Sequence, residues 1–202
     1  MELSMNNVKM AAEYFTGNLT AFNQKDDDYK NLFLAYATDA NSSTIRELAT
    51  LYLLGYDFNL EKHGHDGVDS KTGKLKEVKP RYIKAGDKLG SSGNFNDMTL
   101  DLLETKEDYD VICSMFTEDK LIYVVEFPFS AIYERIKKPI LEAKLGKRVV
   151  CHFRYNDYNI NELVVHYFDA EAARQKNCLS KPHYDMLKNK QDGLSTKLFE
   201  RP

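Results

Sequence analysis

The sequence predicts one α/β domain with a central mixed β-sheet flanked by helices. Helical patterns fill the first 55 residues, pairs of short apolar runs around turn residues follow, and another helical pattern separates the later pairs. Helices and strand pairs mixed along one chain are typical of α/β or α+β folds. The chain has 202 residues, the usual size of one domain, so we expect residues 1–202 to form a single domain.

Helices are expected where apolar residues recur at helical spacing. These stretches are residues 3–16, 31–38, 41–55, 98–109 and 130–146, and the tail from Ala170. Thr44 with Glu47 fits a capping box, and Gly55 fits a C-terminal stop. Pro139 is expected to kink or divide its helix, and Pro182 to interrupt the tail.

Strands are expected as three pairs, each joined by its own turn. The pairs span residues 56–83, 109–129 and 147–169, and their turns lie at 70–74, 117–120 and 156–159. Residues 86–99 are rich in Gly, Ser and Asn, and they are expected to form a loop.

Composition narrows the function classes. The net charge of -3 excludes an indiscriminate polyanion binder, although it allows local basic patches. Cys113, Cys151 and Cys178 are widely spaced, which favours reduced core thiols and provides no zinc framework. No apolar run is long enough to span a membrane, and no secretion signal is recognised. We therefore expect a cytoplasmic protein with no membrane partner.

Residues 63–80 carry the most specific pattern in the chain. An acidic residue, any residue and then Lys occurs six times. The Glu77 copy differs from the others because it lies on an expected strand entered from a hairpin whose other arm carries aspartates.

The length of the hairpin loop decides which aspartate faces Glu77. A four-residue loop at 70–73 pairs Asp66 with Glu77 and places Lys79 on the same face, because side chains alternate along a strand. A loop of odd length would exchange the faces and make Asp69 the candidate.

Two carboxylates and the backbone carbonyl of Val78 would form a hard-oxygen site suited to Mg²⁺. Such a metal polarises a phosphate and lowers the pKa of bound water, and Lys79 would orient or help deprotonate that water. The alternative is a charged hairpin that only solvates an exposed face.

Asp66, the turn and Glu77-Val78-Lys79 resemble the PD-(D/E)XK nuclease superfamily, which includes many type II restriction endonucleases. The resemblance covers roughly residues 43–83, with His-Asp-Gly where the family often has Pro-Asp-Gly. It implies a restriction-endonuclease-like catalytic core at about residues 43–168, with Asp66, Glu77 and Lys79 as catalytic residues. It also implies Mg²⁺, with Mn²⁺ able to substitute, held by Asp66, Glu77 and Val78, with Glu47 or Asp69 as a further ligand.

The expected partner is double-stranded DNA, cut at a specific sequence. One site per chain cuts both strands of a duplex most simply in a homodimer. Basic residues directly after the catalytic strand and polar residues in the following Gly-rich stretch are the DNA-contact candidates. They are Arg81, Lys84, Ser91, Ser92, Asn94 and Asn96.

Two other functions stay open on the sequence. The first is a structure-selective or repair nuclease such as a junction resolvase. The second is a non-catalytic, phage-type interaction protein in which Asp66 and Glu77 would be dispensable. For the Gly-rich stretch the alternative is a connecting loop, and for His63 and His65 it is a surface or packing role.

Overall fold

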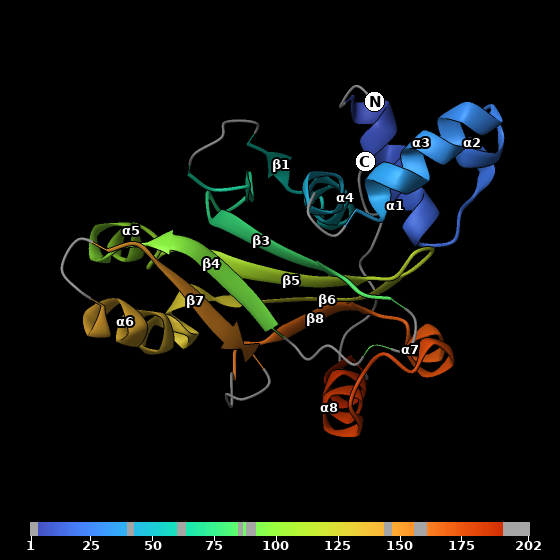
Figure 1. Ribbon diagram of the computed structural model, residues 1–202. Coiled ribbons are helices and arrows are strands. Elements are labelled where there is room, and N and C mark those ends of the chain that lie inside the picture. Colours follow the sequence, from blue (N-terminus) through green and yellow to red (C-terminus); the bar gives the residue numbers. More distant parts are fainter. Residues whose placement is uncertain are drawn as a thin grey trace.

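The computed structural model describes residues 4–39, 43–59, 64–84, 87, 92–143, 147–155 and 161–191. Its strands are β1 (Asp57–Phe58), β2 (Gly67–Val68), β3 (Leu75–Tyr82), β4 (Ser92–Met98), β5 (Asp110–Phe116), β6 (Leu121–Pro128), β7 (Val149–Arg154) and β8 (Val164–Phe168). Six of them form a sheet in the order β1-β2-β3-β5-β6-β8, and β4 pairs with β7 (Figure 1). Since β3 and β5 are parallel and the other pairs antiparallel, the expected mixed sheet is confirmed.

The helices are α1 (Met5–Phe15), α2 (Thr20–Asn23), α3 (Asp27–Ala37), α4 (Thr44–Leu54), α5 (Leu100–Thr105), α6 (Tyr133–Glu142), α7 (Ala170–Lys176) and α8 (Lys181–Gln191). Several begin where a short polar side chain accepts a hydrogen bond from a free backbone N–H of the first turn. The capping residues are Ser4, Asp26, Thr99 and Asp169.

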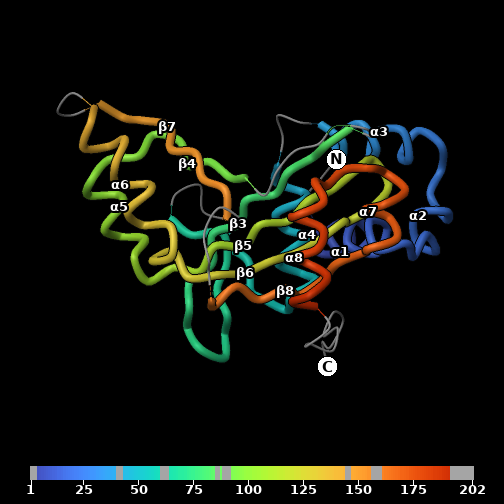
Figure 2. The backbone as a smooth tube through the Cα atoms, turned by 90° about the horizontal axis from the view of Figure 1, so that it is seen from below, coloured from blue at the N-terminus to red at the C-terminus, as the bar shows by residue number. Residues whose placement is uncertain are grey.

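Hydrophobic side chains form a core on each face of the large sheet. On one face, Phe15, Phe33 and Leu51 from α1, α3 and α4 pack with Ile112 and Val124 of the sheet. On the opposite face the core includes residues of α5, α6, α8, β4 and β7. Figures 1 and 2 show α5, α6, β4 and β7 grouped at one end of the sheet, across from α1–α4.

The hairpin between β2 and β3 has the four-residue loop. Gly67 pairs with Lys76 and Val68 with Leu75, and Asp69 N–H donates to the Lys74 carbonyl at 3.0 Å. The even register is therefore confirmed, and it places Asp66 at the end of the pairing, opposite Glu77.

Two expectations about strands are wrong. Residues 92–98 form β4 rather than a loop, because Phe95 and Met98 are buried while Asn96 and Asp97 are exposed. The third expected pair is split, since β7 pairs with β4 and β8 pairs with β6. Local turn composition cannot show pairing between strands that lie so far apart in the chain.

Three details of the helices also differ from expectation. α6 continues through Pro139 as one helix, and Pro182 lies in the first turn of α8 rather than interrupting it. Ser43, not Thr44, is the N-cap of α4, and no capping side chain bonds there, so the capping box does not form. Gly55 does end this helix, with a left-handed φ of 75°.

No helix among the described residues combines the length and the apolar character needed to cross a membrane. Cys113, Cys151 and Cys178 are all buried free thiols, which confirms them as core residues.

Candidate active site

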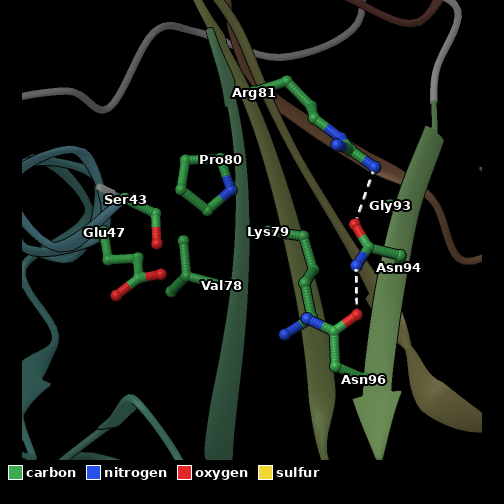
Figure 3. A pocket seen from close by; sticks show the side chains of 9 residues that line it. All are labelled: Ser43, Glu47, Val78, Lys79, Pro80, Arg81, Gly93, Asn94 and Asn96. Atoms are coloured by element: carbon green, nitrogen blue, oxygen red, sulfur yellow. Dashed lines mark hydrogen bonds between the residues drawn. The ribbon is translucent and has the colours of Figure 1, made fainter. Parts of the chain in front are cut away.

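A pocket of about 330 Å³ lies along the edge of β3 that faces β2. Of the β3 residues, only Leu75 and Lys76 pair with β2, so beyond them this edge of β3 has no partner strand within the described part of the chain. The pocket is lined by Ser43, Glu47, Val78, Lys79, Pro80, Arg81, Gly93, Asn94 and Asn96 (Figure 3). It therefore lies between α4 on one side and β4 on the other.

Asp66 lies where the pairing between β2 and β3 ends. Its backbone N–H donates to the Lys76 carbonyl at 2.9 Å, and its Oδ2 accepts the Val78 N–H at 2.7 Å. In a strand the N–H and C=O of one residue point toward the same edge, so the Val78 carbonyl also faces this side. The hairpin thus brings a carboxylate and a backbone oxygen to one edge.

Burial and the nearby charge of Glu77 raise the pKa of Asp66 to about 6. The charge of Lys79 and the hydrogen bond from the Val78 N–H act in the opposite direction but do not outweigh them. Two carboxylates therefore repel each other across the site, which a bound cation would relieve.

Glu77 is buried and has two ammonium partners. One oxygen accepts from Lys79 Nζ, and Oε2 accepts from Lys106 Nζ at 2.6 Å. Burial alone would raise the pKa of Glu77, but the charges of Lys79 and Lys106 outweigh it and lower the pKa. Glu77 is therefore ionised at neutral pH.

The pKa of Lys79 is raised, because the charge and hydrogen bond of Glu77 outweigh the lowering effect of burial. Its Nζ also lies 4.7 Å from the centre of the Phe95 ring. A protonated lysine donates hydrogen bonds and positive charge but does not accept a proton. In this arrangement Lys79 can donate a hydrogen bond to a water molecule and balance negative charge in the pocket.

Lys106 was not identified from the sequence. It follows the last residue of α5, is buried, and packs near the rings of Tyr109 and Phe95. Its sequence signal is its place at the end of Glu104-Thr105-Lys106, one of the six acidic-x-Lys triplets.

Asp69 builds the hairpin turn instead of the site. Its carboxylate accepts from Lys71 N–H at 2.9 Å and from Thr72 Oγ1 at 2.8 Å, and its carbonyl accepts from Gly73 N–H at 2.7 Å. Gly73 has a φ of 73°, a conformation that suits glycine in such a turn. Asp69 therefore stabilises the turn, and the carboxylate that faces Glu77 is that of Asp66.

Glu47 reaches the site from α4, the helix that precedes the hairpin. It lines the pocket on the same side of β3 as Val78 and Pro80 (Figure 3). Its charge raises the pKa of both Asp66 and Lys79, although it is the weakest of the causes named for each. Glu47 is thus near enough to add a third negative charge to the site.

The DNA-contact candidates are arranged in a chain of hydrogen bonds on the β4 side. Arg81 donates to Asn94 Oδ1 at 2.8 Å and to the Ser92 carbonyl at 3.2 Å, and Asn94 donates to Asn96 Oδ1 at 2.7 Å (Figure 3). Lys84 is exposed just after β3. Ser91 and His63 lie outside the described residues, and the ring of His65 contacts Tyr109.

A second charged cluster lies on the opposite face of β3, around Lys76. Its Nζ donates to Asp110 at 2.7 Å and to Glu126 at 2.6 Å, while Glu126 also bonds His166 at 2.7 Å and Tyr56 at 2.9 Å. Each carboxylate has a cationic or hydroxyl partner, so this network joins β3, β5, β6 and β8 and has the features of a structural ion-pair network.

The donor set at the β3 edge is consistent with a hard cation. Asp66, Glu77 and the Val78 carbonyl could provide oxygen ligands, and Asp66 and Glu77 repel each other in its absence. Among the described residues, no three His, Cys, Asp or Glu side chains are arranged to hold a metal ion. A metal here would therefore also require backbone, water or substrate oxygens.

No family model matches the sequence, and the comparison with curated proteins also finds no match.

Proposed function

We propose that the protein is a Mg²⁺-dependent endonuclease of the PD-(D/E)XK type that hydrolyses phosphodiester bonds in DNA. The observation that supports this most strongly is the even hairpin register, which places Asp66 against the Val78 N–H, opposite Glu77 and beside Lys79. This grouping lies at the strand edge that opens into a pocket of about 330 Å³.

Asp66, Glu77 and the Val78 carbonyl would hold the metal, with Glu47 as a further ligand from α4. When bound, Mg²⁺ or Mn²⁺ would polarise the scissile phosphate and lower the pKa of a water ligand. Lys79 stays protonated, and its ammonium group would stabilise the negative charge that develops on the phosphate. Lys106 keeps Glu77 ionised and oriented.

Arg81 and Lys84 follow Lys79 along β3 and its exit, and we propose that they lie along the DNA backbone. The proposal extends to a type II restriction-like enzyme that acts in the cytoplasm as a homodimer on double-stranded DNA. Its nuclease core would then be residues 43–168.

The test is incubation of plasmid DNA with the protein, with and without Mg²⁺, for the wild type, Lys79→Ala and Glu77→Ala. We expect Mg²⁺-dependent cleavage by the wild type into discrete bands and its loss in both variants. Cleavage of branched oligonucleotides in place of plasmid would indicate a structure-selective nuclease instead.

One observation favours the non-catalytic alternative: both oxygens of Glu77 are already bound by lysines, as in a closed structural network. Thermal unfolding with increasing Mg²⁺ separates the two functions, because a ligand that binds the native state stabilises it. We expect Mg²⁺ to raise the Tm of the wild type but not of Glu77→Gln. An equal response of both proteins, together with uncut plasmid, would overturn the nuclease proposal.

A further inference from the structure

The two strands β4 and β7 form a ribbon with one buried and one open face. Ser92 pairs with Arg154 and Asn94 with His152, so these four side chains lie on the same face. Asn96, His152 and Arg154 are exposed, and Val150 on the same side of β7 is 53% exposed. The open face is therefore polar with one apolar side chain; we call it the ribbon face (Ser92, Asn94, Asn96, Val150, His152, Arg154).

The other side of the ribbon is anchored in the core. Phe95, Cys151 and Phe153 are each at most 2% exposed, and the rings of Phe95 and Phe153 pack 5.6 Å apart. A Cβ added at Gly93 would meet the Phe153 ring at 2.3 Å, so the two strands are held close against this ring. The ribbon face is thus presented by rigid backbone, which favours precise recognition.

The ribbon face is continuous with the candidate active site. Asn94 and Asn96 line the pocket together with Lys79, and Arg81 of β3 bonds Asn94. A ligand that fills the pocket therefore extends directly onto the ribbon. Within the described part of the chain, no side-chain hydrogen bond or ion pair involves His152 or Arg154, so both are available to a ligand.

The chemistry of the ribbon face matches the edges of base pairs. Asn side chains pair with adenine, the Arg fork pairs with guanine, and an apolar side chain contacts the thymine methyl group. The major groove is wide enough to admit a two-stranded β-ribbon. Arg81 and Arg154 add positive charge, which suits the potential of DNA.

We propose that the β4–β7 ribbon enters the major groove of duplex DNA and that Asn96, His152 and Arg154 read base edges there. This inference rests on the proposed function in taking DNA as the ligand of the adjoining pocket. It adds β7 to the elements that contact DNA and makes the ribbon the element that selects the sequence to be cut.

The test is enrichment of sequences from a randomised duplex library by binding. It is done in a Lys79→Met background, so that bound DNA is retained, and repeated with the wild type in EDTA. Asn96→Ala, His152→Ala and Arg154→Ala change exposed side chains and leave the core intact. Arg174→Ala, at a side chain that is 69% exposed on α7, is the matched control for loss of a positive charge.

We expect one preferred sequence, and about 10- to 100-fold weaker binding to it in each ribbon variant. Weak binding to unrelated duplexes should be unchanged in Asn96→Ala and His152→Ala, and it should fall less than the specific binding does in Arg154→Ala. Each variant should lose preference at its own base positions. Arg154→Lys keeps the charge but not the fork that pairs with guanine, so it should also change the preferred base at one position. Arg174→Ala should leave both affinity and preference unchanged.

Enrichment of no sequence, or of the same sequence by the parent and by all ribbon variants, would overturn the ribbon proposal. The proposal would also be overturned if Arg154→Lys kept the full base preference of the parent while Arg154→Ala bound DNA more weakly. That result would indicate that Arg154 contacts only phosphates. Sequence-selective binding that depends on the ribbon, without any Mg²⁺-dependent cleavage by the wild type, would support the ribbon proposal and reject the nuclease.

Discussion

Lys106 Nζ lies 2.6 Å from Glu77 Oε2, although 29 residues separate the two in the chain. Lys79 binds the other oxygen, so one buried carboxylate has two ammonium partners at the edge of β3. The lysines provide positive charge where the proposed function places a metal ion. A cation that binds Glu77 must therefore compete with one of them.

Lys106→Met is expected to act in opposite directions on the free and the metal-bound protein. Without metal it should lower the free energy of unfolding by about 1.5–3 kcal/mol, because Glu77 loses a charged hydrogen bond in a buried place. The increase in the free energy of unfolding on adding Mg²⁺ should be larger for Lys106→Met than for the wild type, because the ammonium group that competes with Mg²⁺ for Glu77 is absent. Urea unfolding with and without Mg²⁺ measures both effects.

Lys138→Met, at a side chain that is 67% exposed, is the control and should change stability by no more than about 0.5 kcal/mol. A smaller response to Mg²⁺ in Lys106→Met than in the wild type would contradict the competition.

Asp66→Asn should stabilise the metal-free protein at pH 8 and should abolish the cleavage that the proposed function requires. The folded pKa of about 6 lies above the ordinary 3.8, so the stability that Asp66 contributes at low pH is lost as pH rises through 6. Asn keeps an oxygen for the Val78 N–H but has no charge to bury. We expect a gain of about 1–2 kcal/mol at pH 8 and a smaller one near pH 4, measured by urea unfolding at both pH values.

Asp57→Asn, at an exposed position of β1, is the control for the loss of a carboxylate. If Asp66→Asn is no more stable than the wild type at pH 8, the ionised carboxylate of Asp66 does not destabilise the folded state.

Glu126 should make the protein sensitive to acid. Burial alone would raise its pKa, but the hydrogen bond from His166 and the charge of Lys76 lower it to about 2, against an ordinary 4.5. The stability is therefore fully present above about pH 4.5 and is lost as pH falls toward 2. Glu126→Gln should remove about 2–3 kcal/mol of this pH dependence, measured by denaturant unfolding between pH 7 and pH 3.

Glu104→Gln, at an exposed position of α5, provides the comparison and should keep the acid sensitivity of the wild type. Parallel stability curves for Glu126→Gln and the wild type would mean that the Lys76 cluster does not control acid unfolding.

Gly93→Ala should destabilise the β4–β7 ribbon, because the new methyl group overlaps the Phe153 ring at 2.3 Å. Overpacking of this kind typically costs about 1–3 kcal/mol. Phe153→Leu removes the ring, so the double variant should lose less stability than the sum of the two single variants. A thermal unfolding cycle of the four proteins measures this coupling. Simple additivity would indicate that the strands move apart to accept the methyl group.

The hairpin at residues 63–80 could be predicted closely, because local rules control it. Turn residues set the loop length, the loop length sets the register, and alternation along β3 then places Glu77 and Lys79 on one face. Long apolar periodicity likewise predicted α1, α4, β5 and β6. These features depend on neighbours in the sequence, which is where pattern and propensity act.

Contacts between distant segments were decided only by the tertiary structure. The composition of residues 92–98 is typical of a loop, but pairing with β7 makes them the strand β4. Lys106 has no distinctive sequence context, but its position at the end of α5 brings it into contact with Glu77. The same holds for the Lys76 cluster, which draws on four strands. Local sequence patterns thus predicted the hairpin and reduced its register to two alternatives. The tertiary structure decided which register forms and which charges became buried together, because burial depends on neighbours that no local pattern specifies.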